Sequence, residues 1–261
     1  MSMNIAILTA DEPLYLPSFF SDFLSRRSSD VRVIYMVPPR YGKDSAVRMI
    51  HRYTKAFGLF NLLKLAYRTI TTKVLDKLGF RQGDRYRSIQ SAALAYGIHC
   101  ERAEDVNSIA FLEKLRVEGI DLIVSVSCPQ VFKRPLIELP RLGCLNVHGA
   151  LLPKYRGIAP SFWMMVNGEP NAGVTVFLVN DDIDAGEVVA VRGFPIKPHE
   201  TLHEFILRSK RIACDVLLEA IALVERGNPP TKPLTKTDGS YFSFPTRDAY
   251  KQFRGRGRRL W

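Results

Sequence analysis

The stretch that decides the fold lies near the start of the chain: IAILT at residues 5–9, LYLPSFFSDFLSRR at residues 14–27 and VRVIYMV at residues 31–37. The first and third segments are short, apolar and rich in β-branched residues, which is typical of buried strands. The longer segment between them favours a helix. A strand, a helix and a second strand in this order predict an α/β fold with parallel strands.

The same alternation continues along the chain and predicts a doubly wound, mostly parallel sheet. Further strands are predicted at Leu122–Val126, Cys144–Val147, Val174–Val179 and Glu187–Val191, and helices at Val106–Val117, Val131–Leu136 and Leu202–Glu225. We predict one catalytic domain over residues 1–200. Residues 201–261 are then predicted to form a C-terminal helix and a short basic and aromatic extension.

Composition limits the class of protein. The 261 residues are 46% hydrophobic and 24% charged, an ordinary globular balance. The first predicted strand follows the N-terminus directly and no run of 18 apolar residues occurs, so we expect neither a signal peptide nor a membrane span. The four cysteines form no CxxC pair, which argues against zinc and a disulfide framework. We therefore expect a cytoplasmic protein.

The net charge of +11 is unevenly distributed. From Arg40 to Gln90 there are 12 Lys or Arg against 3 Asp, and from Tyr241 to Trp261 there are 6 against 1. A field of this sign attracts nucleic acid, anionic lipid or a substrate that carries phosphates. A solvated basic surface explains the excess equally well, so charge alone does not choose among these partners.

A basic amphipathic segment interrupts the alternation of strands and helices. From Arg48 to Leu78 apolar residues recur every three or four positions, and seven Lys or Arg fill the gaps. This pattern predicts one helix, or two that break near Gly58. Such a segment could lie on an anionic membrane surface. We favour the more ordinary interpretation, a helix that covers the core with one face while its other face meets water.

The stretch GCLNVHGALLPKYRGIAP at residues 143–160 carries the predicted chemistry. Asn146 and His148 are two residues apart at the end of a predicted strand, so their side chains point to the same face. Ligands of open α/β sheets bind just beyond the carboxyl ends of the strands. There an amide can donate to a developing oxyanion, and an imidazole can accept or donate a proton.

A third candidate is Asp184, in the turn-forming loop NDDIDAG at residues 180–186. Its carboxylate could reach back to the histidine and orient or polarise the ring. An amide donor, a proton carrier and a carboxylate together fit the transfer of an acyl-type carbon to an amine. Taken singly, each motif is more often structural than catalytic.

Taken in order, NVHGALLPKYRG, then GEPNAGVT at residues 168–175 and DAG at residues 184–186, resemble the folate-dependent formyltransferase family. That family includes methionyl-tRNA formyltransferase, glycinamide ribonucleotide transformylase and the sugar N-formyltransferases. The resemblance extends from about Asp121 to Val191. It implies a Rossmann-like core, N10-formyltetrahydrofolate as co-substrate without a metal, and Asn146, His148 and Asp184 as the catalytic set.

The resemblance also implies where the folate donor binds. Its pterin would lie between the loop at residues 127–131 and the loop at residues 181–184. The residues expected to contact it are Ser127, Cys128, Gln130, Val131, Asp181 and Ile183.

Three classes of acceptor compete within the family. A member that modifies transfer RNA would carry a further β-rich domain of roughly 100 residues, whereas only 35 residues follow Arg226. A glycinamide ribonucleotide enzyme would open with a glycine-rich turn that binds phosphate, whereas this chain has TADEPLYLP at residues 9–17. We therefore expect an amino sugar linked to a nucleotide diphosphate, used for bacterial surface polysaccharide such as the O-antigen of lipopolysaccharide. Among these enzymes, the length and the opening residues of the chain most resemble those that formylate GDP-linked perosamine.

The predicted acceptor contacts are Lys154, Tyr155, Arg156, Arg254 and Arg256. Aromatic faces stack on a base and arginines pair with phosphate, although a solvated tail with packed aromatics explains the last segment equally well. We expect a homodimer and no nucleic-acid partner, and peripheral membrane contact stays open. The alternatives are a formyltetrahydrofolate hydrolase, an enzyme like methionyl-tRNA formyltransferase, and a non-catalytic binding relative.

Overall fold

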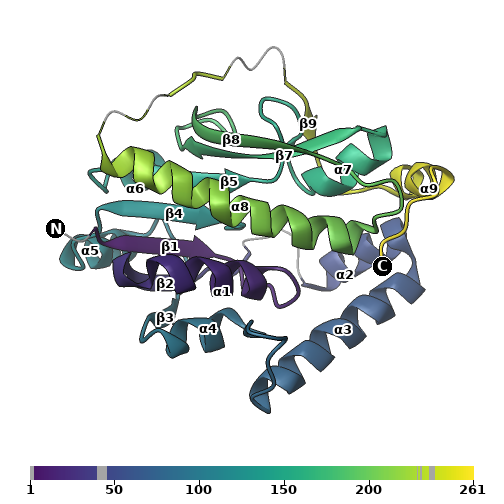
Figure 1. Cartoon of the computed structure of the whole chain (residues 1–261), viewed down its shortest axis with the longest axis horizontal. Helices are drawn as coiled ribbons and strands as arrows, with labels where there is room; N and C mark the ends of the chain where they lie inside the picture. The colour runs from purple at the N-terminus through teal and green to yellow at the C-terminus, as the bar shows by residue number, and fades with distance from the viewer. Residues whose placement is uncertain (1–2, 40–45, 228, 230, 235–238) are drawn as a thin grey trace.

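The computed structural model describes residues 3–39, 46–227, 229, 231–234 and 239–261. Within them a seven-stranded sheet has the order β3-β2-β1-β4-β5-β7-β8. The first five strands in this order pair in parallel, and β7 and β8 are added by antiparallel pairs (Figure 1). This mostly parallel, doubly wound sheet confirms the predicted fold class. The strands are β1 (Ile5–Thr9), β2 (Val31–Met36), β3 (His99–Arg102), β4 (Leu122–Val126), β5 (Cys144–His148), β7 (Asn171–Leu178) and β8 (Glu187–Pro195).

Helices cover both faces of the sheet. Helices α1 (Leu16–Arg27) and α8 (Leu202–Glu225) lie on one face, and α5 (Ile109–Val117) lies on the other (Figure 1). Along β1, Ile5 and Ile7 join the apolar cluster of α1 and α8, while Ala6 and Leu8 join the cluster of α5. The two-residue period of a strand therefore divides the core into two layers.

The strand order reverses between β1 and β4. From β1 the chain runs outward through β2 to β3, and it then returns to place β4 on the other side of β1. The carboxyl ends of neighbouring strands part at such a reversal and leave a crevice. Strand β5 ends at the same edge, so the fold brings the predicted site to this crevice. The remaining described helices of more than one turn are α2 (Ala46–Phe57), α3 (Leu59–Lys77), α4 (Ile89–Ala95), α7 (Pro160–Asn167) and α9 (Arg247–Gly255).

Several predicted boundaries are confirmed and others are wrong. The predicted bounds of β1, β4 and α8 match the structure residue for residue. The helix predicted from Val106 begins at Ile109, because the Ser108 hydroxyl caps it by accepting a hydrogen bond from the Phe111 backbone N–H at 3.3 Å. The sequence does not predict strand β3, because three of its four residues are polar or charged and the strand lies at the edge of the sheet.

The helix predicted over Val131–Leu136 is only a single turn, α6 (Arg134–Ile137). The side chain of Asn107 holds the preceding residues in a loop. Its amide donates to the Val131 carbonyl at 3.0 Å, and its oxygen accepts from the Lys133 N–H at 2.8 Å. These bonds compete with helical ones, and residues 131–133 therefore remain available to line a ligand site.

The basic amphipathic segment forms two helices, α2 and α3, which meet at Gly58. Gly58 has φ +87°, a conformation that favours glycine, so the predicted break is confirmed. Helix α2 sends Ala56 and Phe57 into the core, but none of the 19 residues of α3 is buried. The interpretation of this segment as a cover over the core is therefore wrong for α3.

Helix α8 begins with a reciprocal cap between Thr201 and Glu204 and buries nine residues. Most of these join the core cluster that contains β7 and β8. The division predicted after residue 200 stays a prediction. No helix in the described part of the chain is both long and apolar enough to span a bilayer.

Candidate active site

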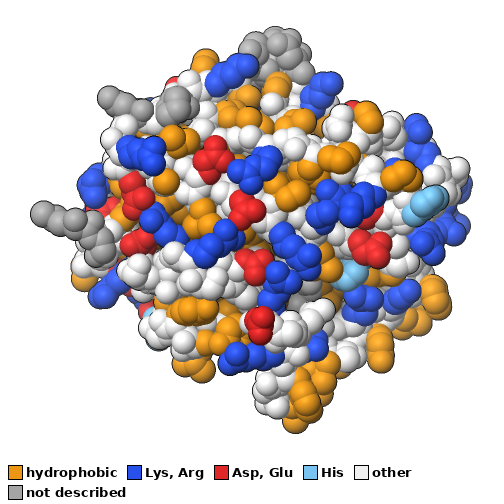
Figure 2. All heavy atoms as spheres, viewed as in Figure 1, with side chains coloured by type: hydrophobic (Ala, Val, Ile, Leu, Met, Phe, Trp, Pro, Cys, Tyr) orange, Lys and Arg blue, Asp and Glu red, His pale blue; other side chains and the backbone are white. Residues whose placement is uncertain are grey.

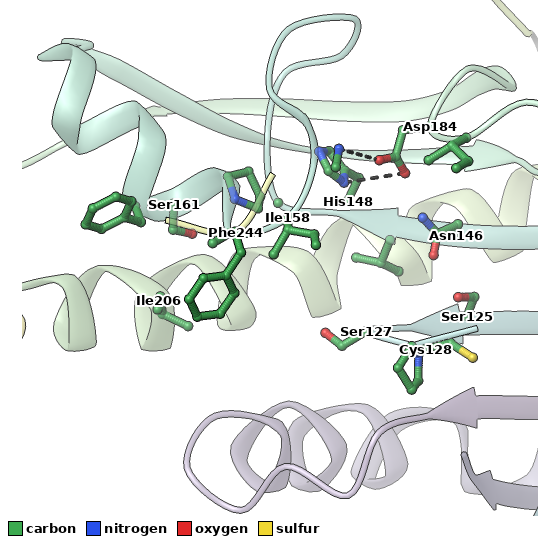
Figure 3. Close-up of a pocket in the computed structure, with 18 of the residues that line it drawn as sticks. Ser125, Ser127, Cys128, Asn146, His148, Ile158, Ser161, Asp184, Ile206 and Phe244 are labelled. Carbon is green, nitrogen blue, oxygen red and sulfur yellow. Dashed lines mark hydrogen bonds and ion pairs between the residues drawn. The ribbon is translucent and has the colours of Figure 1, made fainter. Parts of the chain in front are cut away.

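Asn146 and His148 lie at the carboxyl end of β5 and line a cavity of ≈ 1040 Å³ (Figure 3). Strand β5 is fixed on both sides: Asn146 pairs with Ser125 of β4, and His148 pairs with Thr175 of β7. Since the two residues are two apart on one strand, both side chains share the face that meets the cavity. His148 is 6% exposed, so the walls of the site define the position of its ring.

The hydrogen bonds of His148 define which ring nitrogen can exchange a proton. Its Nε2 lies 2.8 Å from the backbone carbonyl oxygen of Tyr155. A carbonyl oxygen only accepts, so Nε2 carries the hydrogen and Nδ1 is the nitrogen that takes up or releases a proton. Nδ1 lies 3.7 Å from Oδ1 of Asp184. The carboxylate is therefore placed to stabilise the ring when Nδ1 is protonated.

The loop that carries Asp184 is held in one conformation. Asp184 has φ +49°, and its Oδ2 accepts a hydrogen bond from the backbone N–H of Gly157 at 2.8 Å. At Gly186 a Cβ atom would lie 1.7 Å from the carbonyl oxygen of Leu178. Only glycine fits there, and this close approach gives a physical reason for the order Asp-Ala-Gly.

The turn after β5 is locked onto β7. The Thr175 hydroxyl donates to the Ala150 carbonyl at 2.7 Å and accepts from the Leu152 N–H at 3.2 Å. A Cβ atom on Gly173 would lie 2.2 Å from Cδ2 of Leu151. The glycine and the threonine of β7 therefore fit the leucines of the turn, which explains why GALLP and AGVT occur together.

The amide of Asn146 is available for a ligand. Among the described residues its side chain has no hydrogen-bond partner, and Figure 3 shows it between His148 and Ser125 at the cavity wall. A preorganised amide donor beside a proton carrier can stabilise an oxygen that becomes negative during a reaction. The structure thus brings together all three residues of the predicted catalytic set.

All six residues predicted to contact the folate line the cavity. These are Ser127, Cys128, Gln130, Val131, Asp181 and Ile183. Val131 and Ile183 are 60% and 50% exposed, so each loop presents an apolar surface that suits a flat ring. Their contact with a folate stays a prediction.

Two of these six residues have features that the sequence does not reveal. The Gln130 amide donates to the carbonyls of Pro38 and Glu104, at 3.0 and 2.8 Å, and its oxygen accepts from the Val106 N–H at 3.2 Å. Gln130 thus holds the loop in place through its own polar atoms. Burial raises the pKa of the Cys128 thiol to about 11, so this group is neutral near pH 7. No cluster of three or more His, Cys, Asp or Glu among the described residues could hold a metal ion.

The residues predicted to bind the acceptor lie elsewhere. The described residues that line the cavity include none of the five predicted contacts, Lys154, Tyr155, Arg156, Arg254 and Arg256. Tyr155 donates its hydroxyl hydrogen to Glu169 at 2.7 Å. The guanidinium of Arg256 packs against Gly168, and Arg254 donates to a backbone carbonyl of the C-terminal segment at 3.3 Å. The tyrosine and these two arginines therefore contact the protein itself.

The C-terminal segment packs beside the turn that follows β5. Strand β9 (Tyr241–Phe242) pairs in parallel with β6 (Arg156–Gly157). The ring of Phe242 stacks on Tyr155 and Trp163, with centroid distances of 5.1 and 4.9 Å. These aromatic contacts exclude a solvated position for this part of the tail, and they bring Tyr241 and Phe244 into the cavity wall.

Two basic residues that the sequence analysis missed line the cavity, Arg52 of α2 and Lys210 of α8. The guanidinium of Arg52 lies 5.0 Å from the centre of the Phe244 ring. Nζ of Lys210 donates to the Ser127 hydroxyl at 2.8 Å. Burial lowers the pKa of Lys210 to about 8, although the nearby Glu12 carboxylate acts in the opposite direction.

A sequence signal for Lys210 does exist. Ile206 and Ala213, at helical spacing from it, also line the cavity. A lysine on the apolar face of a helix is unusual unless it has a partner. No comparable signal identifies Arg52, because α2 carries basic residues on several sides.

The start of α1 is closed to phosphate by Glu12. The Glu12 carboxylate accepts hydrogen bonds from the backbone N–H groups of Leu14, Tyr15 and Leu16, at 2.9, 2.7 and 3.1 Å. Free N–H groups at a helix start are what bind an anion. Here the side chain of the protein itself occupies them.

Comparison with known proteins gives these features a context. Residues 3–221 match the model of the family described as formyl transferase. Methionyl-tRNA formyltransferase of Syntrophus aciditrophicus is 34% identical over 153 residues, which are 59% of this chain and 49% of that protein. The chain thus spans about half the length of the curated relatives that it matches.

Solved structures share the fold at lower identity. A sugar N-formyltransferase from Shewanella sp FDAARGOS_354 superposes with a TM-score of 0.58 at 18% identity, over 97% of this chain and 87% of that one. WlaRD, a sugar 3N-formyl transferase whose structure was determined in the presence of dTDP and 5-N-formyl-THF, superposes with a TM-score of 0.57 at 17% identity, over 93% and 70%. At these identities the likeness establishes the fold.

Proposed function

The chain belongs to the formyl transferase family, and we propose that it transfers a formyl group from N10-formyltetrahydrofolate to the amine of a nucleotide-diphosphate-linked amino sugar. One observation carries this proposal: the Asn146 amide, which has no side-chain hydrogen bond to any described residue, and the His148–Asp184 pair line a single cavity of ≈ 1040 Å³. Sites for one small molecule commonly measure about 300–1,000 Å³. This cavity lies at the upper end of that range.

The donor side of the proposal rests on two loops. Val131 and Ile183 offer apolar surfaces to a pterin ring, and Asp181 beside them can accept hydrogen bonds from its amino group. N10-formyltetrahydrofolate would supply the formyl carbon.

The residues of the chain would then act in sequence on the acceptor amine. Asn146 donates to the formyl oxygen as negative charge develops there. As the amine nitrogen bonds to the formyl carbon, Nδ1 of His148 would take the proton that the amine loses, and it would return a proton to N10 of the folate as the bond between the formyl carbon and N10 breaks. The Tyr155 carbonyl holds the ring through Nε2. Asp184, at 3.7 Å, stabilises the protonated ring.

The acceptor class is supported by the other end of the cavity. Arg52 lies over Phe244 there, and Tyr241 also lines the cavity. A cation beside aromatic faces suits a diphosphate joined to a base. A ribonucleotide phosphate at the start of α1 is disfavoured, because Glu12 already occupies its N–H groups.

The decisive experiment supplies the purified chain with N10-formyltetrahydrofolate and different acceptors. We expect formylation of a nucleotide-linked amino sugar, and GDP-linked perosamine is the first to try, with dTDP- and UDP-linked amino sugars beside it. Formylation of methionyl-tRNA alone would replace the proposal with the activity named for the curated relatives. Formate release without any amine would identify a hydrolase, and no turnover by the folded protein a non-catalytic relative. A place in surface polysaccharide synthesis and a cytoplasmic location belong to the same proposal.

The acceptor end is tested by matched arginine variants. Loss of a charge-assisted hydrogen bond to phosphate raises the acceptor KM about 10- to 100-fold, and we expect this rise for Arg52→Ala. Arg254→Ala, outside the described lining, serves as the control and should keep the KM of the wild type. If the acceptor KM rises in Arg156→Ala or Arg256→Ala but not in Arg52→Ala, the diphosphate is bound by the arginines predicted from the sequence and not by Arg52.

A further inference from the structure

Helix α3 carries an apolar face that nothing in the described chain covers. Nineteen large hydrophobic side chains are exposed among the described residues, and ten of them lie between residues 47 and 80. On α3 they follow one another every three or four residues and form one line along the helix. We call this line the α3 stripe: Phe60, Leu63, Tyr67, Ile70, Val74 and Leu78, which range from 49% to 76% exposed.

The α3 stripe lies at the outer edge of the molecule. In Figure 1 α3 projects below the sheet, and Figure 2 shows hydrophobic side chains gathered along the corresponding edge. Monomeric proteins rarely leave a continuous apolar surface exposed without a partner.

Basic residues accompany the stripe. Residues 46–81 contain eight Lys or Arg and a single acidic residue, Asp76. Asp76 accepts a hydrogen bond from the Ser91 hydroxyl at 3.0 Å and is thus engaged with α4. Lys73 and Lys77 are exposed beside Ile70 and Val74. An apolar stripe with a basic border is the composition of helices that lie in the plane of a membrane interface.

The contacts that attach α3 to the protein leave the stripe free. Arg68 hydrogen-bonds Nε2 of His203 at 2.7 Å and lies 4.7 Å from the centre of a Trp261 ring. Asn61 donates to the Tyr250 hydroxyl at 3.0 Å. Neither Asn61 nor Arg68 belongs to the stripe, so α3 keeps its position without using those apolar residues.

We propose that the α3 stripe docks on the surface of an anionic lipid bilayer. Its apolar side chains enter the interface, and the lysines beside it meet the headgroups, where each cation near the surface is attracted by the negative potential. A second copy of the chain fits less well, because it would bring the same excess of positive charge to the contact. The proposal goes beyond the formyl transfer and is tested by binding alone, so either can fail without the other.

The test is flotation of the full chain with vesicles of phosphatidylcholine alone and of equal parts phosphatidylcholine and phosphatidylglycerol. The wild type should float with the anionic vesicles and not with the neutral ones, and added salt should weaken its binding. The variant Leu63→Glu with Ile70→Glu should partition at least about 100-fold more weakly. Lys77→Glu should weaken partitioning about fivefold or more.

A matched control separates the stripe from exposed apolar residues in general. Ile109 and Val117 on α5 are 81% and 88% exposed, and Ile109→Glu with Val117→Glu should float as the wild type does. Thermal unfolding verifies that both double variants are folded. A wild type that does not bind anionic vesicles, or a control that loses as much binding as the stripe variant, overturns the proposal. A wild-type dimer that the stripe variant dissociates, with no flotation, shows that the occupant is a second copy instead.

Discussion

Strand β5 and helix α3 are both rich in apolar residues, yet they meet opposite surroundings. Four of the five residues of β5 are buried, whereas none of the 19 residues of α3 is. A strand inside a sheet is hydrogen-bonded on both sides and packed on both faces, so an apolar run has only one place to go. A helix satisfies its own backbone. An apolar stripe on its surface therefore points to a partner for that face without requiring that the same chain supplies the partner.

The largest effect should come from the polar residues at the end of β5. We expect His148→Ala and Asp184→Ala to lower kcat at least about a hundredfold, because one takes up the amine proton and the other stabilises the charged ring. The measurement is turnover at saturating donor and acceptor. His99→Ala on β3, whose side chain is 72% exposed, is the control and should retain wild-type turnover. Near-normal turnover in either folded site variant would remove that residue from the mechanism.

The contrast in burial between β5 and α3 is tested by replacing one leucine in each with alanine. Leu145 of β5 is 0% exposed and Leu63 of α3 is 59% exposed. Leu145→Ala should cost about 2–5 kcal/mol, which lowers Tm by about 4–20 °C for a chain of this size. Leu63→Ala should change the free energy of unfolding by no more than about 0.5 kcal/mol. Equal losses, measured by thermal and denaturant unfolding, would mean that a second copy covers α3 in solution.

The same contrast explains what the sequence could predict. Strands β1 and β4 were predicted residue for residue, because continuous apolar runs follow from burial on both faces. The spacing of Asn146 and His148 was informative because the period of a strand is fixed at two. Edge strand β3 carries no such pattern.

Residues whose position depends on packing between distant elements were not predictable. Arg52 enters the cavity because α2 packs beside it, and nothing in the local sequence distinguishes it from the other basic residues of that helix, unlike Lys210 on the apolar face of α8. Arg254 and Arg256 are predicted to bind the acceptor from their charge alone. They are not among the described residues that line the cavity, because the tail packs through Phe242 on Tyr155 and Trp163. Local sequence does not encode such tertiary contacts.

A smaller effect should come from two glycines that face each other in the sheet. Gly173 of β7 pairs with Gly193 of β8. A Cβ atom at Gly173 would lie 2.2 Å from Leu151, whereas at Gly193 its nearest neighbour would be 3.7 Å away. We expect Gly173→Ala to destabilise by about 1–3 kcal/mol through overpacking. Gly193→Ala should be neutral within about 0.5 kcal/mol or slightly stabilising.

Urea unfolding of the two glycine variants gives the comparison directly. Equal stability would show that the turn after β5 adjusts freely. In that case the fit between Leu151 and Gly173 would not be what holds the turn beside the active site.

The smallest effect concerns Lys210, which is partly buried, and Lys77, which is exposed. Burial lowers the pKa of Lys210 to about 8, from 10.5 for an ordinary lysine, so the folded state carries a cost wherever this group is charged. Between these two values the unfolded chain binds more protons, and the stability of the wild type rises with pH. Below about pH 8 the cost is fully present. Lys210→Met removes it, so the variant should be about 1–2 kcal/mol more stable than the wild type near neutral pH.

That advantage should shrink as the pH rises above about 8, because the lysine of the folded wild type loses its proton while the lysine of the unfolded chain still keeps it. Urea unfolding at about pH 7 and about pH 9.5 measures the difference between variant and wild type at each pH. Lys77→Met on exposed α3 is the matched control, and its difference from the wild type should stay within about 0.5 kcal/mol at both. A Lys210→Met variant that is less stable than the wild type at neutral pH would mean that the hydrogen bond to Ser127 outweighs the cost of burial. The lysine would then stabilise the cavity wall that faces the substrates, instead of being held there at the expense of stability.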